Sequence, residues 1–343
     1  MNGFRRQEGL QRVGLLACLP KMLRRMGVNA EEVLKQSGLA IDALNDPEGV
    51  VAFRSAGRML MLAAKYTHRP SFGLELGKNM RLENLGIVGE YMRHAPSLRI
   101  ALQDFAAHQH RNSHGGMVYL LEEASNAFFG YAIYQPDVVG YSMICDTAAM
   151  AAFQLVCQLA GENHVPEMEV HLCRDAPKDM EPYRQAFGDR LVFNTEQTCV
   201  AVLSTALDQP IPGANSARRT ALGIKLRATW HVGDLDLDTQ LRRAIRMALL
   251  GGKVSATQIA TQFGLGRRNL DRRLEQAGLH YQQVLDETRS DFAQQLLANT
   301  RLDIVSIATI LGFTSPDSLT HAFAQWNGVT PSAWRAGASN PPQ

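Results

Sequence analysis

Residues 254–274 read V-S-A-T-Q-I-A-T-Q-F-G-L-G-R-R-N-L-D-R-R-L, and residues 302–323 read L-D-I-V-S-I-A-T-I-L-G-F-T-S-P-D-S-L-T-H-A-F. The two stretches carry one pattern, whose Ile-Ala pairs and glycines align at an offset of 48 residues. Each copy predicts a helix, a short turn with glycine and a second helix, which is a helix-turn-helix. Such a unit can place its second helix in a DNA major groove.

Both copies open with residues that start helices. Ser255 is an expected N-cap with Gln258 three positions later, and Asp303 is the expected N-cap of the second copy. Gly264 and Gly312 follow the first helices, where a residue in the left-handed conformation commonly ends a helix.

In the first copy the second helix is expected from near Gly266 to about Ala277. Helical spacing places three apolar residues on the inner side: Leu270, Leu274 and Ala277. It places four polar residues on the outer side: Arg268, Asp271, Arg272 and Glu275.

The arginines of this helix suggest DNA contact. Arg268 and Arg272 lie one turn apart near the helix start, where arginine suits bidentate bonding to guanine. Arg267 and Arg273 flank them and could reach phosphates. Four arginines alone indicate only a solvated helix face, but the helix-turn-helix context favours the DNA interpretation.

In the second copy the second helix is expected from near Ser315 to about Asn327. Leu319 and Phe323 form its core pair, and Pro316 suits the first helical position. Its outer face is polar but lacks lysine and arginine, and consists of Asp317, Ser318, Thr320 and His321.

A connecting helix is predicted from Tyr281 to about Asn299, because apolar residues recur there at spacings of three and four. A helix of about 18 residues is roughly 27 Å long. That length is compatible with two units reading successive major grooves, which repeat at about 34 Å.

The stretch from Leu237 to Arg335 resembles the DNA-binding domain of AraC/XylS-type transcriptional regulators. The resemblance is carried by the two quoted motifs and by the closing G-x-T-P-x-x-W-R of residues 328–335. It implies a bacterial regulator that binds asymmetric promoter DNA and often contacts RNA polymerase. It transfers base-contact roles to Arg268, Asp271, Arg272, Pro316, Asp317, Ser318 and His321.

This chain departs from that family's pattern in the second unit. Arginine or lysine is usual where His321, Ala324 and Gln325 stand here. We therefore expect the first unit to supply most of the specific binding and the second to adjust it.

Residues 10–208 mix helix and strand patterns, which predicts an α+β domain. We expect helices over 51–66, 97–108 and 142–160, strands over 117–122, 127–134, 167–172 and 190–193, and either a strand or the start of a helix over 200–203. The region resembles the sensor domain of the branch that includes ornithine-utilisation and VirS-like regulators. The matching words are S-F-G-L-E-L-G (71–77), P-S-L-R-I-A-L (96–102), Y-R-Q-A-F-G-D-R-L-V-F-N (183–194) and L-D-Q-P-I-P-G-A-N (207–215). The resemblance implies effector sensing and dimerisation; the name arabinose-binding domain does not establish arabinose as the ligand.

Two sites in this domain stay open from sequence. Tyr131 and Tyr134 could line an effector cavity, although simple core packing is the favoured interpretation. His108, His110 and His114 have a spacing that metal sites use, but no cysteine or carboxylate pair completes a ligand set, and we expect no metal site.

The length, charge and cysteine content of the chain indicate its domain organisation and location. The chain has 343 residues and a net charge of +2, which predicts two domains and modest non-specific DNA binding. We expect a sensor domain at 10–208, a linker at 209–235 with a basic helix, and an all-α DNA-binding domain at 236–338. Five scattered cysteines and an interrupted apolar stretch at 143–160 predict a cytoplasmic protein with no membrane span.

No catalytic or cofactor motif is complete, so the sequence predicts a regulator and not an enzyme. One alternative is a DNA-binding protein that senses no effector and acts only through partners. The other is a DNA-repair methyltransferase, which would need an activated acceptor cysteine.

Overall fold

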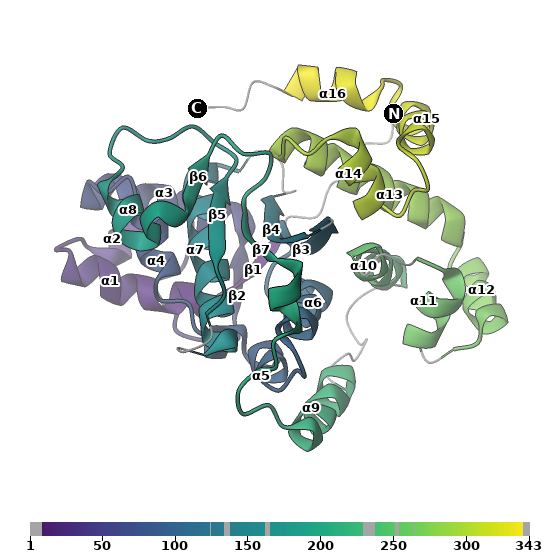
Figure 1. The fold of residues 1–343 in the computed structure, drawn as a ribbon, viewed down its shortest axis with the longest axis horizontal. Coiled ribbons are helices and arrows are strands. Elements are labelled where there is room, and N and C mark those ends of the chain that lie inside the picture. Colours follow the sequence, from purple (N-terminus) through teal and green to yellow (C-terminus); the bar gives the residue numbers. More distant parts are fainter. Residues whose placement is uncertain are drawn as a thin grey trace. The chain divides into compact units, whose positions relative to one another are not determined.

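The chain folds into two compact units, residues 1–224 and 225–343, in the computed structural model (Figure 1). The structure describes residues 9–123, 125–133, 138–161, 165–228, 237–250, 254–263 and 265–338. The first unit mixes helices with two sheets, and the described part of the second is helical. This confirms the predicted order of an α+β domain followed by a helical domain.

The main sheet of the first unit has five strands in the order β3-β4-β7-β5-β6. All neighbours are antiparallel except β5 and β6, which are parallel. The bounds are β3 Gly116–Glu123, β4 Asn126–Ile133, β5 Met168–Leu172, β6 Leu191–Phe193 and β7 Cys199–Leu203. The four predicted strands are thereby confirmed to within two residues, as far as the described residues reach, and residues 200–203 form a strand and not the start of a helix.

A second sheet of two short strands was not predicted. Strands β1 (Leu10–Arg12) and β2 (Val50–Ala52) pair in antiparallel fashion, and Gln11 forms an additional bridge with Ser113. Three-residue strands carry too little alternation to be seen in a sequence. The bridge matters because it brings the start of the chain beside the segment that leads into β3.

Helices surround the main sheet (Figure 1). Their bounds are α1 Leu19–Arg25, α2 Ala30–Gln36, α3 Phe53–Thr67, α4 Phe72–Gly77, α5 Ile87–Arg93, α6 Leu98–His108, α7 Tyr141–Ala160, α8 Glu181–Phe187 and α9 Ser216–Ala228. Short 3-10 helices are η1 Gly14–Cys18, η2 Leu82–Leu85, η3 Gln109–Arg111, η4 Gly188–Arg190 and η5 Ser204–Asp208. The predicted helices over 51–66, 97–108 and 142–160 correspond to α3, α6 and α7.

Helix α7 is the central helix of this unit, since it contacts α3, α4, α6 and three strands of the main sheet. It is long and apolar enough to cross a bilayer, but 56% of that stretch is buried inside the structure. Asp146, in its first half, is fully buried and bonds both the Arg174 guanidinium and the Tyr183 hydroxyl at 2.6–2.9 Å. These contacts are those of a core helix in a folded domain.

The word S-F-G-L-E-L-G has a packing role. A Cβ at Gly73 would overlap the Met143 carbonyl oxygen, and one at Gly77 would overlap the Met150 side chain. The two glycines therefore let α4 lie directly against α7.

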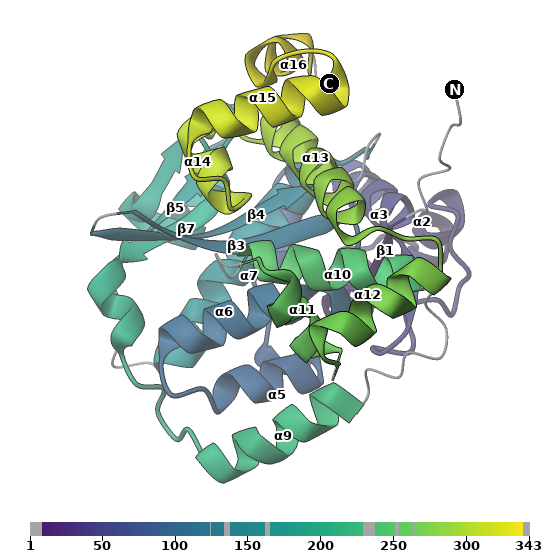
Figure 2. The ribbon, with the colours of Figure 1, turned by 90° about the vertical axis from the view of Figure 1, so that its right-hand side faces the viewer.

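The second unit contains seven helices in its described residues. They are α10 Leu237–Leu250, α11 Ala256–Gln262, α12 Arg267–Gln276, α13 Tyr281–Asn299, α14 Ile304–Ile310, α15 Pro316–Asn327 and α16 Pro331–Ala338. Figure 2 shows α10–α12 toward one end of the long helix α13 and α14–α16 toward the other. The two predicted helix-turn-helix units and their connecting helix are confirmed.

The predicted helix caps are confirmed as well. The Ser255 hydroxyl accepts from the Gln258 amide at 3.2 Å, and the Asp303 carboxylate accepts from the Ser306 amide at 2.7 Å. Gly312 has a φ of 70° and ends α14, as expected. Gly264 lies outside the described residues.

Candidate DNA interface and ligand cavity

Helix α12 presents a basic face to solvent. Leu270 and Leu274 are buried in the unit, while Arg268, Arg272 and Arg273 are exposed. In the described part of the chain, no salt bridge engages Arg268 or Arg272. The two guanidinium groups that sequence placed toward base edges are thus available for a ligand. Ala277, expected on the inner side, is exposed because α12 ends at Gln276 and Ala277 is already its C-cap.

Arg267 and Asp271 are paired with each other within α12. The Arg267 Nε donates to the Asp271 carboxylate at 2.8 Å, and the guanidinium also lies over the Tyr281 ring at 5.3 Å. The pair is half-exposed, so water screens it and its contribution to stability is small. It nevertheless orients Arg267 along the helix toward the start of α13, at the flank of the basic face.

Helix α15 occupies the place in the second helix-turn-helix that α12 occupies in the first, and the two helices differ in charge. Leu319 and Phe323 are fully buried, matching Leu270 and Leu274, while Asp317 and His321 are exposed. The helix sequence, P-D-S-L-T-H-A-F-A-Q-W-N, contains no lysine or arginine.

Several α15 residues predicted to contact DNA form local bonds. The Ser315 hydroxyl caps the helix by accepting from the Ser318 amide at 3.2 Å, and it also bonds the Ser318 hydroxyl at 2.9 Å. Thr320 donates to the Pro316 carbonyl at 2.9 Å, and Pro316 occupies the first helical position as predicted. These bonds fix the helix start and leave Asp317 and His321 as its outward groups.

The closing motif G-x-T-P-x-x-W-R stabilises the packing of the second helix-turn-helix. Gly328 has a φ of 74° and ends α15, and Thr330 caps α16 by accepting from the Ala333 amide at 3.3 Å. The Trp334 ring packs edge-on against Phe323 at 5.8 Å. Arg335 donates to the carbonyl oxygens of Leu297 and Leu302. The most specific sequence mark of this domain is therefore structural.

The basic helix expected in the linker is α9, and two of its arginines bind the first unit. Arg218 donates to Glu90 of α5 at 3.0 Å, and Arg219 donates to Asp104 of α6 at 2.6 Å. The Arg219 guanidinium also lies over the Tyr91 ring at 4.0 Å. These arginines anchor the start of the helix to the first unit.

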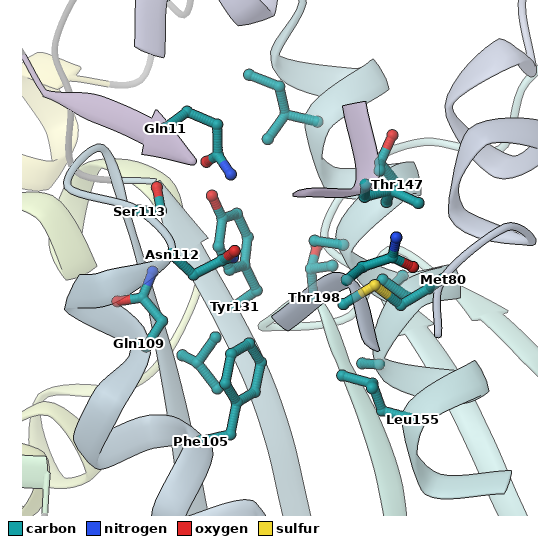
Figure 3. A pocket seen from close by; sticks show the side chains of 18 of the residues that line it. Gln11, Met80, Phe105, Gln109, Asn112, Ser113, Tyr131, Thr147, Leu155 and Thr198 are labelled. Atoms are coloured by element: carbon teal, nitrogen blue, oxygen red, sulfur yellow. The ribbon is translucent and has the colours of Figure 1, made fainter. Parts of the chain in front are cut away.

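The first unit contains a partly open cavity of about 130 Å³ (Figure 3). Its lining comes from the helices η1, η2, η3, α3, α6 and α7, from the strands β1, β3, β4 and β7, and from the loops beside them. Apolar side chains dominate, among them Phe53, Leu60, Phe105, Phe129 and Leu155.

Hydrogen-bonding side chains gather toward one end of this cavity. In Figure 3, Gln11, Ser113 and the Tyr131 hydroxyl lie toward one end, while Phe105 and Leu155 lie toward the other. The Gln11–Ser113 bridge accounts for two members of this polar end. The position of the Tyr131 hydroxyl depends on Gly116, because a Cβ at that residue would overlap the hydroxyl.

Tyr131 therefore does more than pack in the core, which was the favoured interpretation from sequence. It lines the cavity together with Phe129, two positions earlier on β4. The other candidate, Tyr134, lies outside the described residues. Sequence reasoning missed Gln11, Gln109, Asn112 and Ser113, because single amides and hydroxyls in three-residue elements and loops carry no pattern.

The histidines at 108–114 show no metal geometry in the described residues. His108 Nδ1 bonds the Asp104 carbonyl at 2.9 Å and its ring packs edge-on against Tyr91. Among the described side chains, which do not include that of His110, no three metal-ligating groups come together.

Four of the five cysteines lack the activation that methyl transfer requires. All five are free thiols. Burial raises the pKa of Cys18 to about 11 and that of Cys145 to about 12, and it also raises the pKa of Cys157 and Cys199. These four thiols are protonated at neutral pH, whereas an acceptor cysteine must be a thiolate.

Comparison with known families agrees with this geometry. Residues 27–211 match the arabinose-binding N-terminal domain of AraC transcription regulators, and residues 259–337 match a helix-turn-helix domain. The chain belongs to the AraC family. It is therefore a DNA-binding transcriptional regulator, whose cavity lies in the arabinose-binding-type domain and whose basic helix α12 lies in the helix-turn-helix domain.

Similar regulators span nearly the whole chain. The ornithine utilization regulator of Pseudomonas aeruginosa is 26% identical over 94% of this chain and 95% of its own length. VirS of Mycobacterium tuberculosis is 25% identical over 92% and 93%. The solved structure of the transcriptional regulator CdpR from Pseudomonas aeruginosa is 23% identical over 91% and 97%, with a TM-score of 0.44.

Proposed function

We propose that this AraC-family regulator activates transcription from an asymmetric promoter site under the control of a small-molecule effector. Helix α12 recognises most of the DNA sequence of the site, and α15 adjusts the affinity for DNA from the adjacent groove. The effector binds in the cavity of the first unit. The repair methyltransferase is disfavoured by the protonated cysteines.

The observation that carries this proposal is the unequal exposure of charge on the two recognition helices. Arg268 and Arg272 project from α12 in the part of a recognition helix that meets base edges. On α15 the equivalent positions hold Asp317 and His321. Each bidentate arginine–guanine pair discriminates by about 1–3 kcal/mol, and neither Asp317 nor His321 has the two-donor fork that makes this contact.

The wider assignments follow from the same division of the chain. We assign effector binding and homodimerisation to residues 10–208, the connection to 209–235 and DNA binding to 236–338. RNA polymerase is the expected partner at the promoter, and the cytoplasm is the expected location.

Genome-wide occupancy followed by footprinting tests the proposal. Wild-type protein should protect asymmetric sites, and Arg272→Ala should lose most of them while His321→Ala keeps them. Equal loss in the two variants would show that the units share specificity.

The same experiment repeated with candidate metabolites tests effector control. Reporter transcription from a bound promoter should rise with one of them while occupancy depends on Arg272 throughout. Transcription that ignores every metabolite, yet requires a protein partner, would support the effector-independent alternative.

A further inference from the structure

We propose that the effector is a small, neutral and largely apolar molecule with one hydrogen-bonding end. This inference rests on the proposed function, which makes the cavity an effector site. It specifies the chemical class of the ligand.

The charge of the lining is the first argument. None of the described residues that line the cavity is acidic, basic or a histidine. An ion moved from water into such a site has no counter-charge, and that transfer costs several kcal/mol. A carboxylate or ammonium ligand would need a partner that this lining does not provide.

A nearby arginine does not change this conclusion. Arg12 follows Gln11 in the chain, but its guanidinium bonds the Glu48 carboxylate and the Asn84 carbonyl oxygen. The Arg12 side chain is 7% exposed and is absent from the lining. Its charge is therefore already neutralised by Glu48.

The polar end of the cavity is the second argument. Gln11, Asn112, Ser113 and Tyr131 offer amide and hydroxyl groups, which both donate and accept. Gln11 already donates to the Arg12 carbonyl, and Ser113 accepts from the Gly115 amide. Because a hydroxyl or an amide takes part in more than one hydrogen bond, these side chains keep capacity for a hydroxyl, carbonyl or neutral amide on a ligand.

The size of the cavity is the third argument. Its volume of about 130 Å³ is close to that of an engineered cavity of about 150 Å³ that holds one benzene. The apolar part is built from Phe53, Phe105, Phe129, Leu60 and Leu155. A single ring or a short branched chain with one polar substituent fits this space and this division of polarity.

This class excludes ornithine, which the name of one relative raises as a candidate. Ornithine carries an ammonium group at each end and a carboxylate, and the lining has no charge to match any of them. The prediction therefore separates this regulator from one that binds a free amino acid in the same place.

Thermal unfolding of the full chain with two matched pairs of probes tests the inference. Benzyl alcohol and benzylammonium share one shape, as do benzamide and benzoate, and each pair differs in charge. The neutral members should raise the melting temperature by roughly 5–10 °C at about a hundredfold excess over Kd. The two ions and ornithine should leave the melting temperature unchanged.

Two variants place the binding in the cavity. Ala152→Phe adds a ring to the lining and should abolish the shift. Tyr131→Phe removes one hydroxyl and should weaken benzyl alcohol binding about 2- to 10-fold, the value of one hydrogen bond. Tyr66→Phe is the matched control, because its hydroxyl bonds Gln36 outside the cavity.

Three outcomes would overturn the inference: shifts from the ions, no shift from any probe because the cavity holds only water, or a shift in Ala152→Phe as large as that of the wild type together with unchanged benzyl alcohol affinity in Tyr131→Phe. Affinity for promoter DNA, measured on the same protein without probes, is a separate readout. Loss of that affinity in Arg272→Ala tests the proposed function whatever the probes do.

Discussion

The two helix-turn-helix units share a core and differ on their outer faces. In both, two buried residues one turn apart hold the recognition helix: Leu270 and Leu274 in α12, Leu319 and Phe323 in α15. On the outside, α12 exposes Arg268 and Arg272 where α15 exposes Asp317 and His321. Packing constrains the inner face of a duplicated unit, while the outer face is free to diverge. A repeat in sequence therefore establishes equal folds without establishing equal functions.

The largest effect is expected in the shared core. Phe323→Ala should destabilise the second helix-turn-helix by about 3–5 kcal/mol, because it leaves a cavity. For the same reason Leu274→Ala should destabilise the first helix-turn-helix by about 2–5 kcal/mol. Phe323 also supports Trp334 of the closing motif. Denaturant unfolding of both variants would measure this, and two effects below 1 kcal/mol would contradict a common core.

The next largest effect is expected on DNA binding by the outer face of α12. Arg272→Ala should weaken binding to the promoter site by about 1–3 kcal/mol, concentrated at one base pair, with little change in stability. Binding to a panel of single-base variants of the site measures both quantities. A loss spread evenly over all sequences would show that Arg272 contacts only phosphate.

Arginines introduced on the outer face of α15 should strengthen its binding to DNA. The double substitution Asp317→Arg and His321→Arg replaces a carboxylate and an imidazole on α15 with two guanidinium groups. Affinity for DNA should rise, and its logarithm should fall more steeply with the logarithm of salt concentration, by about 1 for each new phosphate contact. The matched control is Asp303→Asn, which keeps the helix cap and lies outside the recognition helix. An unchanged salt slope would show that α15 does not meet the backbone.

The smallest effect is expected at residues that are already paired or that lack the two-donor fork of arginine. His321→Ala should change affinity by less than about 1 kcal/mol, because an imidazole cannot make the bidentate contact of a guanidinium and loses about one hydrogen bond. Arg267→Gln should also be mild, since Arg267 is held by Asp271 and Tyr281. Fluorescence anisotropy with promoter DNA measures both, and a loss equal to that of Arg272→Ala would break the contrast between the units.

The candidate sites were predictable to different degrees. The DNA face could be read from sequence because helical periodicity and N-cap residues are local signals. The cavity could not, since it joins Gln11 of a three-residue strand, Phe105 of α6 and Tyr131 of β4. Only Tyr131 had been singled out, and core packing was favoured for it.

Local chemistry in the sequence determined the two helix-turn-helix units, their caps and the basic face of α12, because these depend on residues within a few turns of one another. Tertiary structure alone decided the rest. It tied Arg267 to Asp271 and Tyr281, and it bound Arg218 and Arg219 of α9 to carboxylates more than 100 positions earlier. It also assembled an uncharged cavity from distant elements. Such pairings depend on how the chain closes on itself, and no periodicity along the sequence records that.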